Sequence, residues 1–243
     1  MDNAIINVPI PENEPVLGYA KGSSEREHIS RALDIIRTEE LEIPLVIGGK
    51  EVRTGKTARV RMPHNHKEVL ATYHLAGEVE VRQAIDAAIE AKRGWASLPW
   101  AERAAVMQRA ASIISQEYRY LLNAATMLGQ SKTVHQAEID SACETIDFLR
   151  FNAHYASQIY SIQPTSNSEQ SNSIEYRELE GFVFTVSPFN FTAIASNLNM
   201  APVMMGNTTL AYLQTGTSNR WARSRLPEKS VIASKSQMDL ELS

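Results

Sequence analysis

The spacing of hydrophobic residues changes along the chain and divides it into three parts. Residues 43–75 hold short apolar runs separated by turn residues, a pattern typical of β-strands. From residue 78 to residue 160, apolar residues recur three or four positions apart, which predicts several helices. Residues 182–210 hold an apolar run, a helical stretch and a second short run. This order predicts an α/β fold.

The first part predicts an extended arm, one helix and several strands. Residues 1–24 are punctuated by prolines and read as an extended N-terminal arm that ends at Ser24, the expected helix cap. Ile43–Ile47, Gly48-Gly49 and Lys50–Val52 together predict a hairpin with a glycine turn. Two further extended segments are expected at residues 58–62 and 68–75.

The middle part predicts a layer of helices. A helix that begins near Glu78 is expected to break at Gly94-Trp95, and a second helix carries the apolar stripe from Ala104 to Ile114. Tyr118–Met127 continues helical and should end at Gly129. Residues 132–160 predict one long helix, and residues 162–175 a polar loop or hairpin.

The last apolar runs predict a βαβ unit. Phe182–Val186 reads as a buried strand, residues 191–205 as a helix, and Gly206–Leu210 as a second, parallel strand. Residues 211–243 have no coherent apolar period, and we expect this tail to be disordered. A sheet that begins with only two strands leaves apolar surface exposed, so we expect low solubility or partial folding.

Composition narrows the possible partners and compartment. The chain has 243 residues, of which 43% are hydrophobic and 21% charged, as in ordinary globular proteins. A formal net charge of −4 gives no reason to expect nucleic acid or an anionic membrane as a partner. The N-terminus shows no targeting pattern, and a single cysteine excludes an internal disulfide, so a cytoplasmic location is expected.

The most informative position is the end of the first strand of the βαβ unit. Asn190 follows this strand at the start of a helix, where its side-chain amide could donate a hydrogen bond to a developing oxyanion. The same helix start could receive a dinucleotide phosphate. Asparagine also caps helices, so the residue type alone leaves both interpretations open.

Four separated segments of the chain form a recognisable set: Asn13–Leu17, Gln130–Asp140, Ile146–Asn152 and Glu180–Ile194. Together they resemble the aldehyde dehydrogenase superfamily. Within it, they are most similar to the L-glutamate γ-semialdehyde dehydrogenase branch, also called 1-pyrroline-5-carboxylate dehydrogenase. The resemblance covers residues 13 to 210 and implies the N-terminal part of the fold, with residues 25–210 as the N-terminal part of a Rossmann-like NAD-binding domain.

The resemblance implies roles for four residues. Asn190 matches the asparagine that stabilises the oxyanion, and Ser187 matches a position that contacts NAD, the implied cofactor. Phe191 and Glu138 match positions at the pocket of the small-molecule substrate. Each also has a simpler interpretation: Ser187 as a turn residue, Phe191 as core, and Glu138 as a solvated helix carboxylate. The resemblance also implies that the complete protein is a homo-oligomer.

The sequence also departs from the family. The family continues its second strand with Trp-Lys-Pro, whose lysine binds the adenosine ribose, whereas this chain has Ala211, Tyr212 and Leu213. The only cysteine, Cys143, lies in the long helix, and no family nucleophile or general base follows. We therefore expect no activity from these residues alone. A non-catalytic assembly partner and a frameshifted gene product are the alternatives.

Two histidines, His64 and His66, stand in a predicted loop and could suggest a metal site. Two such ligands without a third nearby are a weak signal, so a solvated loop is the better interpretation. We expect no metal.

Overall fold

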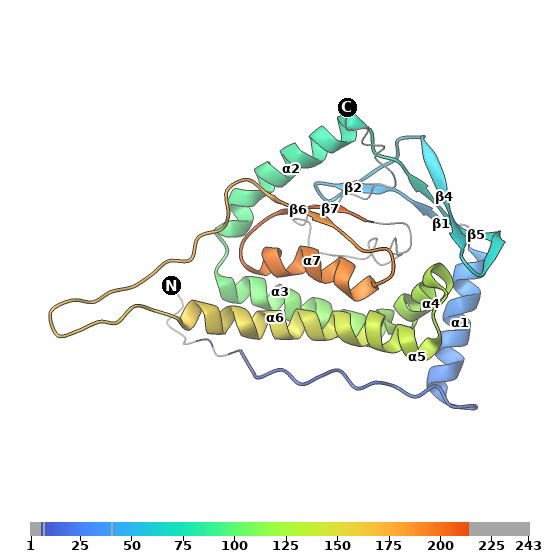
Figure 1. Ribbon diagram of the computed structural model, residues 1–243, viewed down its shortest axis with the longest axis horizontal. Coiled ribbons are helices and arrows are strands. Elements are labelled where there is room, and N and C mark those ends of the chain that lie inside the picture. Colours follow the sequence, from blue (N-terminus) through green and yellow to red (C-terminus); the bar gives the residue numbers. More distant parts are fainter. Residues whose placement is uncertain (1–5, 7, 40, 214–243) are drawn as a thin grey trace.

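The computed structural model describes residue 6, residues 8–39 and residues 41–213. An extended arm precedes the first helix, a small sheet and hairpin follow, and a group of helices leads into a second small sheet (Figure 1). The elements are α1 Ser24–Thr38, β1 Leu41–Ile43, β2 Leu45–Ile47, β3 Lys50–Val52, β4 Thr57–Met62, β5 Asn65–His74, α2 Glu78–Ala96, α3 Trp100–Ile113, the π-helix η1 Ile114–Tyr118, α4 Arg119–Gln130, α5 Val134–Ala137, the π-helix η2 Glu138–Cys143, α6 Glu144–Ser161, β6 Val183–Val186, α7 Thr192–Met204 and β7 Thr209–Tyr212.

The arm and α1 form much as the sequence predicts. The cap of α1 is Ser23 rather than Ser24, because the Ser23 hydroxyl accepts a hydrogen bond from the backbone N–H of Arg26. Ile29 and Ala32 of α1 are buried against Ala124 of α4. This contact places α1 beside the helices that carry the candidate site.

The strands before residue 75 form two separate sheets. β2 and β3 pair as the predicted hairpin, and Gly48 and Gly49 have φ angles of 56° and 77°, which glycine adopts readily. Ile43, expected in the hairpin, instead ends β1, which pairs parallel to β5. The strand order in the sheet that contains β1 is β1-β5-β4. The pairing is non-local, so the apolar run alone did not reveal it.

Two expected helix breaks lie elsewhere. α2 continues through Gly94 and Trp95, because the buried Trp95 ring packs into the core and its indole N–H donates to Val203 O at 2.8 Å. α4 passes Gly129 and ends at Gln130, and its C-cap residue Ser131 takes the left-handed conformation with φ 56°. At Gly94, the tertiary packing of Trp95 therefore outweighs the weak helix propensity of glycine.

The long helix expected at residues 132–160 forms as a continuous run of α5, η2 and α6. Its middle turns are a π-helix from Glu138 to Cys143. α6 packs against α3 and α7, and Met107, Ile146, Leu149 and Met204 belong to the shared core. Within the described residues, no helix is both long and apolar enough to cross a membrane.

β6, α7 and β7 form the predicted parallel βαβ unit, in which Val183 of β6 lies opposite Thr209 of β7. The second strand lies later than expected, at Thr209–Tyr212. α7 covers one face, where Thr185 Oγ1 donates to Asn199 Oδ1 at 2.6 Å. β6 was expected to be buried, but Phe184 and Val186 on its other face are 55% and 52% exposed. The remainder of the predicted tail, 214–243, lies outside the described residues.

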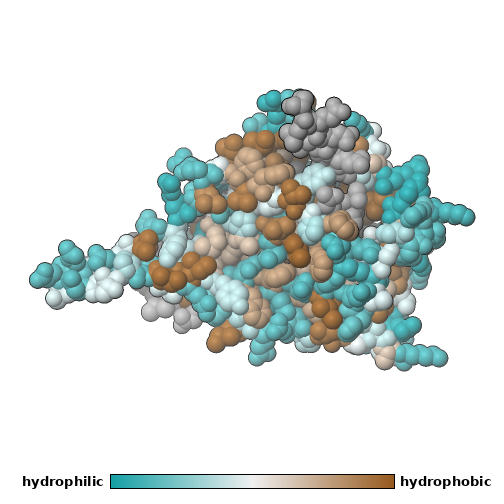
Figure 2. All heavy atoms as spheres, in the orientation of Figure 1, coloured by the Kyte–Doolittle hydropathy of each residue, from teal (hydrophilic) through white to brown (hydrophobic). Residues whose placement is uncertain are grey.

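Residues 162–182 form a long excursion between α6 and β6 that projects from the body (Figure 1). It contains no helix or strand, and hydrogen bonds such as Ile174 N to Gln163 Oε1 connect its two sides. Figure 2 shows that hydrophobic residues form several separate patches on the same view of the molecule. Large exposed apolar side chains include Ile162, Leu179, Phe184 and Phe189.

Candidate functional site

The turn between β6 and α7 brings three of the four predicted site residues together. Ser187 is buried at the end of β6, and its backbone N–H donates to Tyr212 O of β7 at 2.9 Å. Asn190 follows in the turn, and Phe191 is the N-cap residue of α7. β6 is paired with β7 and α7 packs into the helical core, so both ends of the turn are attached to the fold.

Lys132 fixes the centre of this turn. Its ammonium donates to the backbone carbonyl of Asn190 at 2.5 Å and lies 4.4 Å from the centroid of the Phe191 ring, within range of a cation–π contact. The same ammonium forms an ion pair with Asp140 of η2. Lys132 therefore connects the turn to η2, the element that begins with Glu138.

A second connection runs through buried hydroxyl groups. Thr126 of α4 lies 2.9 Å from Ser141 of η2 and 2.9 Å from Thr192 at the first position of α7. All three residues are buried. Buried hydroxyl groups are costly unless they are paired, so this chain of hydrogen bonds fixes the relative position of α4, η2 and α7.

Asn190 is half-buried and is one of the residues that line a pocket beside the turn. Among the described residues, no hydrogen bond is recorded for its side-chain amide, and Lys132 uses only its backbone carbonyl. An amide held on a fixed backbone with a free N–H can donate to an oxygen that gains negative charge during a reaction. The geometry is therefore compatible with the predicted oxyanion role.

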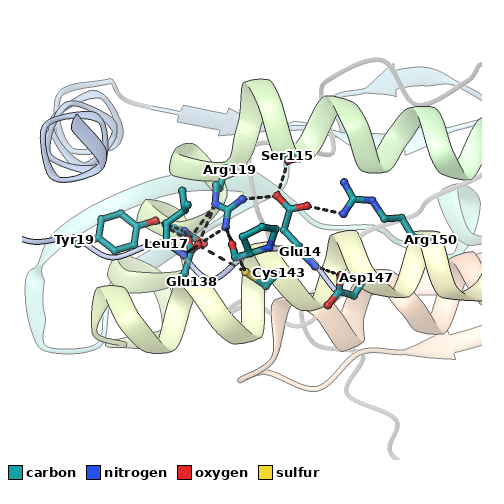
Figure 3. A network of polar contacts seen from close by, with 11 residues as sticks. Glu14, Leu17, Tyr19, Ser115, Arg119, Glu138, Cys143, Asp147 and Arg150 are labelled. Carbon is teal, nitrogen blue, oxygen red and sulfur yellow. Dashed lines mark hydrogen bonds and ion pairs between the residues drawn. The ribbon is translucent and has the colours of Figure 1, made fainter. Parts of the chain in front are cut away.

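Glu138 lies in a different environment, a buried network of polar groups (Figure 3). Its side chain is 0% exposed, and its carboxylate forms an ion pair with Arg119. The same carboxylate accepts from Tyr19 at 2.6 Å, Asn123 at 2.7 Å and the Leu17 N–H at 2.8 Å. Its negative charge is thus balanced inside the protein rather than directed into a pocket.

Glu14 extends this network to the N-terminal arm. Its carboxylate accepts hydrogen bonds of 2.6 Å from each of Ser115, Arg119 and Arg150, while its backbone N–H donates to Asp147 at 2.7 Å (Figure 3). The arm is therefore attached to η1, α4 and α6 by charged hydrogen bonds, which are the stronger kind.

The network sets the protonation of its members. Burial alone would raise the pKa of Glu138, but hydrogen bonds from Arg119, Tyr19 and Leu17 outweigh it and hold that pKa below the ordinary glutamate value. The pKa of Glu14 is lowered in the same way, against burial, by Ser115, Arg150 and Arg119. Both groups are carboxylates at neutral pH.

Cys143 is unsuited to nucleophilic catalysis. It is buried, and burial together with the nearby Glu138 carboxylate raises the pKa of its thiol to about 12. A thiol with this pKa is almost entirely protonated at neutral pH, and the thiolate is the nucleophilic form. Its Sγ instead contacts Pro15 O and Glu138 Oε1, both at 3.7 Å.

Several residues that build the site were not singled out in the sequence. Lys132, Arg119 and Glu14 each act on groups far away in the chain, and no local pattern reveals such partners. Lys132 lies in Gln130–Asp140, one of the four segments that resemble the aldehyde dehydrogenase superfamily, but the resemblance implied no role for this lysine. The predicted roles of Asn190, Ser187, Phe191 and Glu138 stay predictions.

His64 and His66 do not come together with a third ligand in the part of the chain that the structure describes. His64 Nδ1 lies 2.8 Å from the Ser131 hydroxyl, and no group of three or more possible metal ligands occurs there.

The turn fits part of a dinucleotide site. β6 and β7 are parallel neighbours whose carboxyl ends, at Val186 and Tyr212, lie side by side, and α7 begins directly after the turn. Nucleotides bind at such strand ends, with phosphates near a helix N-terminus. Tyr212 lacks the positive charge of the lysine that the resemblance implies at this position.

Comparison with known proteins agrees with this arrangement. The profile described as "Aldehyde dehydrogenase family" matches residues 51–219, more than half of the chain. The chain therefore belongs to the aldehyde dehydrogenase family. Within it, the chain belongs to the 1-pyrroline-5-carboxylate dehydrogenase branch, as its relatives indicate.

Curated relatives match along most of this chain but only part of their own length. The probable delta-1-pyrroline-5-carboxylate dehydrogenase of Schizosaccharomyces pombe is 49% identical over 209 residues, which are 85% of this chain and 38% of the relative. The mitochondrial delta-1-pyrroline-5-carboxylate dehydrogenase of Homo sapiens is 45% identical over 198 residues, which are 82% of this chain and 35% of the relative. This chain thus spans a little over a third of these proteins. Its expected cytoplasmic location stays a prediction.

Solved structures give the same result. The Delta-pyrroline-5-carboxylate dehydrogenase of Mycobacterium tuberculosis bound with NAD matches with a TM-score of 0.91 and 42% identity, over 96% of this chain and 45% of that chain. The 1-pyrroline-5-carboxylate dehydrogenase from Thermus with bound NAD matches with a TM-score of 0.79 and 27% identity. The match covers 87% of this chain and 41% of that chain. The fold is therefore that of the N-terminal part of these proteins.

Proposed function

We propose that this chain is the N-terminal part of an NAD-dependent dehydrogenase that oxidises L-glutamate γ-semialdehyde, in equilibrium with 1-pyrroline-5-carboxylate, to L-glutamate. In this proposal, Asn190 stabilises the oxyanion that forms when a thiolate adds to the aldehyde. Ser187 and the start of α7 form part of the cofactor site. Bound NAD would supply the acceptor for the hydride that leaves the carbon after the thiolate has added.

The observation that carries the proposal is the position of Asn190, in a turn held by Lys132 and beside a pocket. Its backbone carbonyl is held by Lys132, and the half-buried residue lines a pocket, so its side-chain amide could donate to an oxyanion there. The sequence similarity to 1-pyrroline-5-carboxylate dehydrogenases supports the choice of substrate.

We further propose that these 243 residues do not catalyse the reaction by themselves. Oxidation through a thiohemiacetal needs a thiolate, and the one cysteine of the sequence is the buried, protonated Cys143. Phe191 and Glu138 would contribute to the substrate pocket of a complete enzyme. For Glu138 this requires a second role, beside its ion pair with Arg119.

The test is a chimaera that joins residues 1–210 to the remaining C-terminal part of the Schizosaccharomyces pombe relative. NADH formation from 1-pyrroline-5-carboxylate is expected for the chimaera and not for the 243-residue chain. Asn190→Ala should lower kcat of the chimaera about 10²–10³-fold, because one oxyanion donor is lost. Asn172→Ala, in the exposed excursion, is the matched control and should leave kcat unchanged. If the chimaera with Asn190→Ala has the same kcat as the chimaera with Asn172→Ala, the proposed role of Asn190 is contradicted.

A second candidate function is that of a non-catalytic assembly partner for a full-length enzyme of the branch. The exposed Phe184 and Val186 on β6 favour it, because parallel sheets normally have both faces covered. The chain should then co-purify with a co-expressed full-length relative. Absence of co-purification, with both proteins present in the soluble fraction, contradicts this candidate.

A further inference from the structure

A pocket of about 330 Å³ lies where three distant segments meet. β4 contributes Arg59 and Arg61, the end of α4 contributes Gly129 and Gln130, and the β6–α7 turn contributes Phe189 and Asn190. The volume is at the lower end of the range for small-molecule sites.

Both charged residues of this pocket are cations. Arg59 and Arg61 are two positions apart on β4, so their side chains leave the strand on the same face, and both are exposed. Neither forms an ion pair in the part of the chain that the structure describes, and the pocket is lined by no carboxylate there. Arg61 donates to His66 O at 2.8 Å through Nη1 and keeps its other N–H groups.

Two guanidinium groups that line one pocket without an ion-pair partner among the described residues repel each other and attract an anion. An oxyanion bound between them would accept charged hydrogen bonds from both arginines, and Asn190, which lines the same pocket, offers its side-chain amide as a neutral donor. Carboxylate and phosphate oxygens match this donor geometry.

The rest of the lining is apolar. Phe189 lines the pocket and is 69% exposed. Val60 of β4 and Pro63, which follows β4, complete the apolar side. An exposed aromatic ring beside two cations suits a ligand that has both an acidic group and a short apolar body.

We propose that this pocket binds a small organic anion, a carboxylate or a phosphate ester, between the guanidinium groups of Arg59 and Arg61. The acidic group contacts the two arginines and the Asn190 amide, and the apolar body lies against Phe189. Binding here needs neither NAD nor the dehydrogenase reaction, so its test is independent of the proposed function.

The test is titration of the ¹⁵N-labelled full chain with butyrate and, separately, with inorganic phosphate, followed by NMR. The Asn190 side-chain amide signal should shift with either anion. Butyrate binding more tightly than phosphate identifies a carboxylate ligand, and the reverse order identifies a phosphate ligand. The double variant Arg59→Gln/Arg61→Gln should bind at least about tenfold more weakly, since each charged hydrogen bond contributes about a factor of ten or more.

Two further variants separate the site from general effects. Arg31→Gln/Arg37→Gln removes the same charge from exposed positions of α1 and should bind like the unaltered chain. Arg59→Lys/Arg61→Lys keeps the charge and should retain part of the binding. The proposal is overturned if neither anion binds the unaltered chain, if the glutamine pair binds normally, or if the α1 control weakens binding as much.

Discussion

At the scale of single residues, Arg119 is the group on which most of the buried charge depends. It forms ion pairs with Glu14 and Glu138, and the three side chains are nearly inaccessible to solvent. Burial lowers the pKa of Arg119, whereas the carboxylates of Glu138 and Glu14 raise it. The effect of the carboxylates is larger, so the pKa is raised. Without this guanidinium, Glu138 would keep only neutral donors.

Replacement of Arg119 should therefore be strongly destabilising. Arg119→Met is expected to lower the free energy of unfolding by about 3–5 kcal/mol, because it leaves buried carboxylate charge without a partner. Urea titration followed by circular dichroism measures the change.

Arg82→Met is the matched control, since the exposed Arg82–Glu78 pair on α2 should contribute about 1 kcal/mol or less. The double variant Arg119→Met/Glu138→Gln should recover part of the loss. Equal destabilisation by Arg119→Met and Arg82→Met would show that the buried network adds little.

At the scale of elements, two π-helical segments determine which side chains meet. η1 ends just before Arg119, and η2 begins with Glu138. A π-turn inserts a residue into the helical repeat and changes the direction of the side chains that follow, and such turns are frequent at functional sites. The arm then packs along these segments through Glu14.

The attachment of the arm to these helices should be sensitive to acid. The folded pKa values of Glu14 and Glu138 lie below the unfolded value of about 4.3. Their contribution to stability is therefore complete above about pH 4.3 and is lost as pH falls through the folded pKa values. Unfolding free energies measured from pH 7 to pH 2.5 should decrease over this lower window.

Glu138→Gln provides the comparison for this pH series. It removes one of the two titrating groups, so the decrease between pH 5 and pH 2.5 should be smaller than in the unaltered chain. A decrease of the same size would assign the acid sensitivity to other carboxylates.

At the scale of the whole molecule, the helical core is extensive but the second sheet is open. The described chain packs α3, α6 and α7 around a common core, whereas β6 and β7 pair only with each other. Relatives of this branch are more than twice as long as the matched region. The exposed face of β6 is thus the part of the fold with the least support.

We expect the isolated chain to self-associate through this face. Phe184→Thr/Val186→Thr should lower the associated fraction in sedimentation velocity, because threonine keeps β propensity and removes the apolar surface. Val79→Thr/Ile89→Thr on exposed positions of α2 is the control and should change association little. A monomeric unaltered chain with a sharp, cooperative thermal transition would contradict the expectation.

The sequence by itself determined the local elements and the family. Apolar periodicity predicted the helices, the β2–β3 hairpin and the parallel β6–α7–β7 unit, because these depend on neighbours in the chain. Four short segments were sufficient for the aldehyde dehydrogenase assignment, and one of them placed Asn190 at the end of a strand.

Only the tertiary structure decided how distant groups are paired. It separated Ile43 from the hairpin, carried α2 through Gly94, enclosed Glu138 with Arg119, and set Lys132 against the Asn190 turn. Each of these outcomes depends on contacts between residues far apart in sequence, where burial and charge pairing outweigh local propensity. Such energies have no signature in a single stretch of chain, so they become visible only when the segments are brought together.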